Sequence, residues 1–244
     1  MESNSRFGDS PPTTAANQTV VRQAPDRVAC LDAKGRDSQF VRHHSGFTVF
    51  RDLFSTSDFE AILDEASERY REGSEGRVEL ADGSDGPGGP PRRRLITSNG
   101  GAAQDAVYQS ADLRRFLTSL CGIPVTPAGR LGSFNYYTRD ADFMGLHLDV
   151  DPCDLVVLTV LKDHSKPNDP GGATRVYPRH LGRSLSSVRR DRGAGAVTLK
   201  LLAGQSIVMF GGLVPHEIVP VHAGQRRIVS ALCFRAGGSD GCAL

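Results

Sequence analysis

Two residues, His147 and Asp149, have the spacing needed to bind one metal ion from one face of a β-strand. Side chains alternate between the two faces of a strand, so residues i and i+2 share a face and lie about 6–7 Å apart. Imidazole and carboxylate groups both bind divalent metals. The pair alone is weak evidence, because a His-x-Asp match arises readily by chance in a chain with 7 histidines and 28 acidic residues.

A second segment, SIVMFGGLVPHEIVPVHAGQRRIVSALCF, supplies a third candidate ligand, His216. It reads as three strands separated by glycine turns, with His216 opening the second strand and Arg226 following ten residues later. A turn at residues 222–225 places Arg226 near residues 219–221, and we expect its side chain to project into the interior beside the metal. Two histidines and one carboxylate with open coordination positions form the ligand set of oxygen-activating Fe(II).

The segment HEIVPVHAGQRR resembles the His-x-Val-x-Pro-Val-x-x-Gly-x-Arg pattern of the prolyl-4-hydroxylase-like branch of the Fe(II)/2-oxoglutarate-dependent dioxygenase superfamily. YYTRDADFMGLHLDV is similar to the tyrosine-rich strand that leads into His-x-Asp in this branch, and DPGGAT to its Gly-Gly turn. The resemblance covers roughly residues 46–235. The pattern is matched by His216, Ile218 in place of Val, Pro220, Val221, Gly224 and Arg226.

The resemblance implies that His147, Asp149 and His216 are catalytic iron ligands and that Arg226 binds the distal carboxylate of 2-oxoglutarate. A guanidinium suits this role because it offers two parallel donors to a planar carboxylate. Arg226 and Arg227 are adjacent, so a shift of one residue in strand register would exchange the one that points inward. Further contacts to the co-substrate are expected from Tyr137, Asn135 and Ser230.

The resemblance implies hydroxylation of an unactivated C–H bond. Fe(II) would be the bound metal, 2-oxoglutarate and O2 would be consumed, and succinate and CO2 would be released. Ascorbate is a further expected stimulant. Related halogenases have Ala or Gly where this chain has Asp149, so the carboxylate favours hydroxylation, with desaturation or ring closure as variants.

The substrate is less sharply defined. A core of about 200 residues without an added recognition domain favours a small molecule, either an amino acid or a specialised metabolite. A peptidyl or protein side chain of the prolyl type is the alternative. A non-catalytic, cupin-like metal-binding protein is a hypothesis from a different class.

Composition argues against several partners and compartments. The net charge of +1 does not favour nucleic acid. We find neither an apolar stretch of the roughly 20 residues that a membrane helix needs nor a secretory signal at the N-terminus. The five cysteines are scattered without a Cys-x-x-Cys pair, so we expect no disulfide framework or zinc knuckle and take the cytoplasm as the default compartment. The sequence leaves the oligomeric state open.

The elements that must position these residues are mostly strands. Eight short runs rich in β-branched and aromatic residues alternate with turns, which predicts a mostly-β fold: a double-stranded β-helix, jelly-roll or cupin-like, with N-terminal supporting helices. The runs are 131–137, 143–150, 155–161, 173–177, 196–201, 206–210, 216–221 and 227–234.

Upstream of these strands we expect a strand at 46–50, a helix within 54–73 capped by Ser57 or Thr56, and a helix near 110–120. Residues 73–91 are interpreted as a long surface loop. The following run Arg92–Arg94 is interpreted as solvated loop, with the binding of an acidic substrate group as the alternative. The expected domains are a tail at 1–40, the dioxygenase domain at 41–236 and a C-terminal tail at 237–244.

Overall fold

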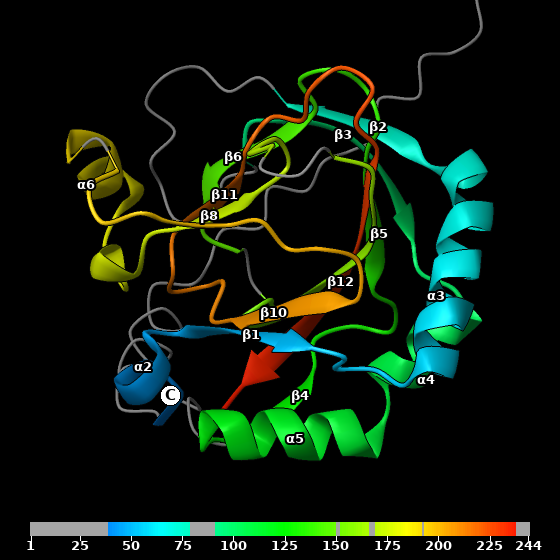
Figure 1. The fold of residues 1–244 in the computed structure, drawn as a ribbon. Coiled ribbons are helices and arrows are strands. Elements are labelled where there is room, and N and C mark those ends of the chain that lie inside the picture. Colours follow the sequence, from blue (N-terminus) through cyan, green and yellow to red (C-terminus); the bar gives the residue numbers. More distant parts are fainter. Residues whose placement is uncertain (1–38, 79–90, 150–151, 166–168, 192, 238–244) are drawn as a thin grey trace, which may run out of the picture.

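The computed structural model describes residues 39–78, 91–149, 152–165, 169–191 and 193–237. Its main feature is one antiparallel sheet that curls around an interior (Figure 1). The strands follow the order β1-β10-β7-β12-β5-β3-β6-β11-β8-β9 across the sheet, with β2 added to β3 and β4 added to β12. Their bounds are β1 (Phe47–Arg51), β2 (Ser74–Val78), β3 (Arg93–Asn99), β4 (Val125–Pro127), β5 (Ser133–Tyr137), β6 (Phe143–His147), β7 (Leu155–Asp163), β8 (Thr174–Val176), β9 (Val197–Leu199), β10 (Gln205–Met209), β11 (His216–Ile218) and β12 (Arg227–Ala236).

The helices lie outside the curled sheet (Figure 1). They are α2 (Gln39–His44), α3 (Thr56–Arg69), α4 (Ala102–Tyr108), α5 (Ala111–Cys121) and α6 (Leu185–Arg190), with short 3-10 turns at Tyr70–Glu72 and Pro178–His180. The apolar faces of α3, α4 and α5 belong to the same buried cluster as the outward side chains of β5, β7 and β12. None of the helices in the described ranges combines the length and apolarity needed to cross a membrane.

Strand alternation divides this sheet into a helix-covered face and a face that lines the interior. In β5, Phe134 and Tyr136 are fully buried in the core cluster with the helices. The alternating residues Ser133, Asn135 and Tyr137 line the interior pocket. In β12, Val229 and Ala231 line the pocket, whereas Leu232 and Phe234 belong to the core cluster. The face that each residue occupies therefore follows from its parity along the strand.

The fold class expected from the sequence is confirmed, and all eight strands expected between residues 131 and 234 are present. The strand at 47–51 and the helices at 56–69 and 111–121 are also confirmed. The cap of α3 is Ser55 and neither of the two residues proposed, because the Ser55 hydroxyl accepts a hydrogen bond from the backbone N–H of Asp58 at 3.1 Å.

Other expectations need correction or lie outside the described residues. Arg93 and Arg94 begin β3 and are not part of a loop, and residues 74–78 pair with them as β2. The remainder of the expected loop, 79–90, lies outside the described residues, as do 1–38 of the expected N-terminal tail and 238–244 of the C-terminal tail.

The cysteines also differ from expectation, because Cys153 and Cys233 form a disulfide with a Cα–Cα distance of 4.9 Å. The bridge joins β12 to the segment that enters β7, across a sequence separation of 80 residues. Cys153 Sγ lies 3.8 Å from the Oδ2 atom of Asp149. Cys121 is buried and free.

Glu65 on α3 forms hydrogen bonds to the backbone at the start of α4. Its carboxylate accepts hydrogen bonds from the backbone N–H groups of Gly101, Ala103 and Gln104 at 2.7–3.1 Å. These are N–H groups that the first turn of a helix leaves without partners, and a carboxylate there also interacts favourably with the helix dipole.

We predict that Glu65→Ala lowers the free energy of unfolding by about 1–3 kcal/mol, since three N–H groups lose a charged acceptor. Glu60→Ala, an exposed position on the same helix, is the matched control and should change stability by less than about 0.5 kcal/mol. Urea denaturation of both variants measures the difference. Equal midpoints for the two variants would contradict this role for Glu65.

Candidate metal centre

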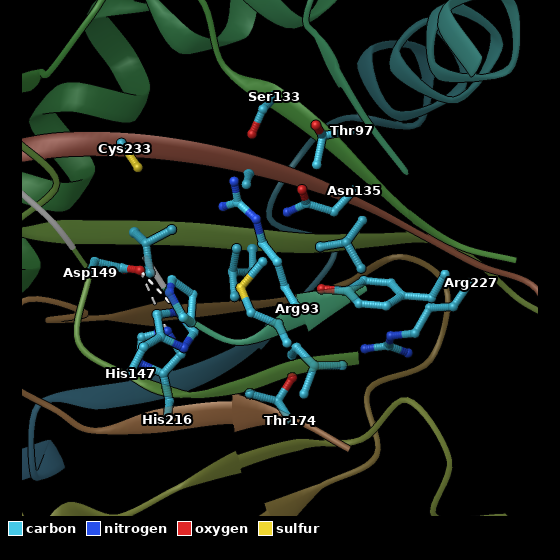
Figure 2. A pocket seen from close by; sticks show the side chains of 18 of the residues that line it. Arg93, Thr97, Ser133, Asn135, His147, Asp149, Thr174, His216, Arg227 and Cys233 are labelled. Atoms are coloured by element: carbon cyan, nitrogen blue, oxygen red, sulfur yellow. Dashed lines mark ion pairs between the residues drawn. The ribbon is translucent and has the colours of Figure 1, made fainter. Parts of the chain in front are cut away.

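The three candidate metal ligands converge at one end of the sheet interior (Figure 2). His147 ends β6, His216 begins β11, and the two residues are directly opposed in the antiparallel pairing of these strands. Asp149 follows two residues after His147. One side-chain donor atom from each residue lies within 4.8 Å of the other two. The predicted convergence of these three side chains is therefore confirmed.

Backbone carbonyls fix which nitrogen each imidazole presents to the centre. His147 Nδ1 lies 2.7 Å from the carbonyl oxygen of Gly145, and His216 Nδ1 lies 2.9 Å from that of Val214. A carbonyl only accepts, so each Nδ1 carries the proton and each Nε2 keeps its lone pair. Both Nε2 atoms face the Oδ1 atom of Asp149, at 3.5 and 3.6 Å.

These separations suit a shared ion better than direct hydrogen bonds. Ligand atoms at about 2.0–2.2 Å from one ion lie roughly 3–3.5 Å from each other. A neutral imidazole whose second nitrogen donates to a carbonyl is the usual arrangement of a metal-binding histidine. The donor set therefore fits a divalent ion.

Charge and burial shift the titration of all three groups. Burial raises the pKa of Asp149, but the electrostatic influence of the neighbouring imidazoles, His216 first and then His147, outweighs it and holds this pKa below its ordinary range. Burial and the neighbouring His216 lower the pKa of His147. Burial also lowers the pKa of His216, but the carboxylate of Asp149 outweighs it and the net pKa is raised. Asp149 is thus held as a carboxylate, the form that binds metal.

Gly211 makes room for Asp149. A Cβ atom at position 211 would lie 1.8 Å from Asp149 Oδ2, a separation that no side chain can accept. The backbone carbonyl of Gly211 also accepts a hydrogen bond from the N–H of Asp149 at 2.8 Å. This glycine therefore sets the position of the carboxylate, although its backbone conformation does not require glycine.

A cavity of about 380 Å³ extends from the three ligands into the curled sheet. Its walls are largely apolar, and they include side chains of β3, β5, β7 and β12. Figure 2 shows three sets of polar side chains apart from one another, in addition to Thr174: the metal ligands, Arg227, and a group formed by Arg93, Thr97, Ser133 and Asn135. A small cavity with few polar groups is typical of a small-molecule site.

Arg227 is the arginine that reaches this cavity, and its side chain is only 1% exposed. Its Nη1 atom donates to Asp163 Oδ2 at 2.7 Å and to the carbonyl of Leu201 at 3.0 Å. Its Nε atom is buried without a hydrogen-bond partner. A buried donor of this kind costs free energy unless a ligand satisfies it. The free edge of the guanidinium therefore fits a bound carboxylate.

The expected orientation of Arg226 is wrong. Arg226 is exposed and does not line the cavity. In β12 the cavity face is formed by Arg227, Val229 and Ala231, and Arg226 has the opposite parity. Because side chains alternate along a strand, an expected register that is wrong by one residue assigns every residue of β12 to the wrong face.

Ser230 shows the same error. It has the parity of Arg226 and faces the helices, where its hydroxyl accepts a hydrogen bond from Gln104 Nε2 at 2.8 Å. It does not line the cavity. A direct contact between Ser230 and a ligand in the cavity is therefore excluded by its position.

Tyr137 and Asn135 lie on the cavity face of β5, as expected. Tyr137 is directly opposed to Arg227 in the pairing of β5 with β12. Burial raises the pKa of Tyr137 above its ordinary range against the opposing influence of Arg227. Its hydroxyl therefore stays protonated and can donate a hydrogen bond to an anion held by Arg227.

Three residues at this site were not identified from the sequence. Asp163 accepts from Arg227 and also pairs with Lys200 at 3.1 Å, and these contacts hold its pKa below the ordinary value although burial acts to raise it. Gly211 and Arg93 are the other two. The Arg92–Arg94 run was the only sequence signal for Arg93. The sequence around Asp163 and Gly211 gives no signal of their roles.

Comparison with known proteins finds similarity in structure. No protein-family model matches the chain, and no curated protein matches its sequence. A prolyl-4-hydroxylase from Pseudomonas putida has 19% identity and a TM-score of 0.52, covering 85% of this chain and 100% of the other. A prolyl hydroxylase from Trichoplax adhaerens in complex with a hypoxia inducible factor peptide has 16% identity and a TM-score of 0.56, covering 87% and 94%. HygX from Streptomyces hygroscopicus, with nickel and 2-oxoglutarate bound, has 16% identity and a TM-score of 0.53, covering 80% and 84%. At these identities the shared property is the fold.

We predict that Gly211→Ala weakens metal binding roughly 10–100-fold, because the added methyl group displaces the Asp149 carboxylate. Titration with Co(II), followed by its visible absorption, measures the affinity. Gly129→Ala is the matched control, since the nearest atom to its added Cβ would be 3.9 Å away. Wild-type affinity in Gly211→Ala would contradict the role given to this glycine.

Proposed function

We propose that this chain is an Fe(II)- and 2-oxoglutarate-dependent oxygenase that hydroxylates an unactivated C–H bond. The observation that carries the proposal is the presence in one cavity of two complementary sets of groups. One is the His147–Asp149–His216 cluster with both Nε2 lone pairs turned inward. The other is a buried guanidinium, Arg227, with an unsatisfied Nε–H. The fold shared with prolyl hydroxylases and HygX supports the same reading.

The three ligands would hold Fe(II) and leave coordination positions open toward the cavity, as the two-histidine, one-carboxylate set does in oxygenases of this type. When bound there, Fe(II), 2-oxoglutarate and O2 together supply oxidative decarboxylation, which gives succinate and CO2 and inserts oxygen into a C–H bond. The carboxylate of Asp149 occupies a position that would otherwise be open to another anion. This favours hydroxylation.

Arg227 would bind the distal carboxylate of 2-oxoglutarate, and Tyr137 would donate a hydrogen bond to the same group. Asp163 and Leu201 hold one side of the guanidinium, so the opposite edge is presented to the cavity in a fixed orientation. A preoriented guanidinium loses little conformational freedom on binding, which favours affinity. Asn135 remains a predicted contact at the border of this region.

A small-molecule substrate is the proposal that the cavity favours. Its 380 Å³ lies near the lower end of the range for ligand pockets and must also accommodate the co-substrate. HygX has been solved with hygromycin B bound. The alternative, a peptidyl side chain, is supported by the similarity to a prolyl hydroxylase that holds a peptide. The catalytic unit that we propose spans residues 41–236.

We predict that anaerobic addition of Fe(II) and 2-oxoglutarate produces the weak visible charge-transfer band of the chelate. A non-catalytic, cupin-like binding protein would not develop it. Succinate release under O2, measured with small molecules and with proline-containing peptides in parallel, then distinguishes the two substrate classes. Failure to form the band with stoichiometric Fe(II) bound would rule out the proposed function.

Adjacent arginines provide a matched pair for the co-substrate site. We predict that Arg227→Met raises the 2-oxoglutarate concentration at half-maximal band intensity about 10–100-fold, as expected for loss of a charged hydrogen-bonding partner. Arg226→Met should stay within about twofold, because its side chain is exposed.

Arg227→Lys, which keeps a cation beside Asp163, separates loss of binding from loss of folding and should still weaken 2-oxoglutarate binding, because the two-pronged donor geometry is lost. If Arg226→Met strongly weakened 2-oxoglutarate binding and Arg227→Met left it unchanged, the strand register expected from the sequence would be correct and the assignment of Arg227 would be wrong.

A further inference from the structure

Arg93 is a second guanidinium in the cavity, and the proposed function gives it no role. It begins β3, and it lines the cavity together with Thr97 on the same strand. Its Nε atom is buried without a hydrogen-bond partner. The Arg93 side chain forms no hydrogen bond or ion pair with another described residue. Buried polar atoms of folded proteins are rarely left in this state, and a bound ligand is one way to satisfy them.

The surroundings of Arg93 hold the guanidinium inside the cavity. Figure 2 shows its side chain extending between the metal ligands on one side and Asn135 and Arg227 on the other. β2 packs against it with a glycine: a Cβ atom at Gly76 would lie 3.3 Å from Arg93 Nε, which is a tight contact. The missing side chain at position 76 therefore leaves the space that Arg93 occupies.

Thr97 and Ser133 complete a small polar region with Arg93. Both line the cavity, and their side chains have no hydrogen-bond partner within the described part of the chain. The rest of the wall near them is apolar, with Met144, Val229 and Ala231. One cation and two free hydroxyl groups on an apolar wall can bind an anionic group and leave a hydrocarbon portion in van der Waals contact.

Arg93 and Arg227 differ in whether an acidic side chain pairs with the guanidinium. Arg227 lies against Asp163, which Lys200 also contacts. No carboxylate of the described chain pairs with Arg93, so its charge has no counter-ion there. Arg93 as a whole is half-buried, and an anionic ligand would supply both the missing counter-ion and a partner for the buried Nε–H.

We infer that Arg93 binds a carboxylate of the substrate, so that the enzyme acts on a small carboxylic acid; the inference rests on the proposed function. A single guanidinium matches the charge and the planar geometry of one carboxylate. The reacting C–H bond then lies on the portion of the substrate that spans from Arg93 toward the metal ligands. Arg93 is thereby a specificity-determining residue, distinct from the co-substrate residue Arg227.

The inference is tested by titrating the anaerobic Fe(II)·2-oxoglutarate protein with matched acids and amides. The probes are acetate, butyrate and benzoate against acetamide, butyramide and benzamide, with inorganic phosphate as a further anion. Paramagnetic broadening of the probe NMR signals, referenced to the Zn(II)·2-oxoglutarate protein, gives the dissociation constants. We expect at least one acid to bind about tenfold or more tightly than its amide, as for a charge-assisted contact.

Arg93→Met should remove this preference, and Arg93→Lys should retain part of it because the charge remains. Arg92→Met is the matched control: Arg92 is exposed beside the ring of Phe143 and does not line the cavity, so the preference should persist. Each of four results would overturn the inference: equal binding of acids and amides, no binding of any acid, preferential binding of phosphate, or an unchanged preference in Arg93→Met.

The visible band of the Fe(II)·2-oxoglutarate chelate separates this test from that of the proposed function. It is recorded before any probe is added. If the wild-type protein lacks the band, the proposed function is wrong. The acid and amide comparison is then made on the Zn(II) protein by isothermal titration calorimetry, which needs no paramagnetic ion. A band that is lost in Arg93→Met would assign this residue to the co-substrate and would also overturn the inference.

Discussion

The pairing of β6 with β11 is the constraint on which the site depends. It sets His147 directly opposite His216, and the carbonyl groups two residues before each histidine hold both rings with Nε2 turned inward. Asp149 can complete the set because Gly211 leaves the space for its carboxylate. A shift of one residue in this pairing would turn one imidazole away from the other. The helices and the remaining strands matter to the chemistry because they keep this pairing in register.

Around the metal ligands, the curled sheet arranges positive charge in two different ways. Arg227 is held by Asp163 and by the carbonyl of Leu201, so its orientation is fixed and part of its charge is offset. Arg93 has neither support and projects into an apolar cavity. A site of this form can hold one anion rigidly as a constant co-substrate and use the second cation to select among variable substrates.

The sequence predicted the metal ligands and the strands because both leave a local signature: His and Asp at strand spacing, and β-branched runs between turns. It did not predict which arginine faces inward, because β12 is apolar on both faces and its alternation gives no parity. β3 was not predicted because it begins with arginines, which are typical of a solvated loop. The cavity that Arg93 lines forms through the pairing of β3 with β5 and β6, which are distant in sequence. Gly211 and the Cys153–Cys233 bridge depend on contacts between distant segments, for which the spacing of residues carries no signal.

The most direct test of this account is a crystal structure of the protein grown anaerobically with Fe(II) and 2-oxoglutarate. We expect one ion at about 2.0–2.3 Å from His147 Nε2, His216 Nε2 and an oxygen of Asp149, close to the usual ligand distances of such sites. We also expect the distal carboxylate of the co-substrate to lie against Nε and the free edge of Arg227, beside the Tyr137 hydroxyl. An ion bound through Nδ1 or away from these three residues, or a co-substrate carboxylate that does not contact Arg227, would contradict it.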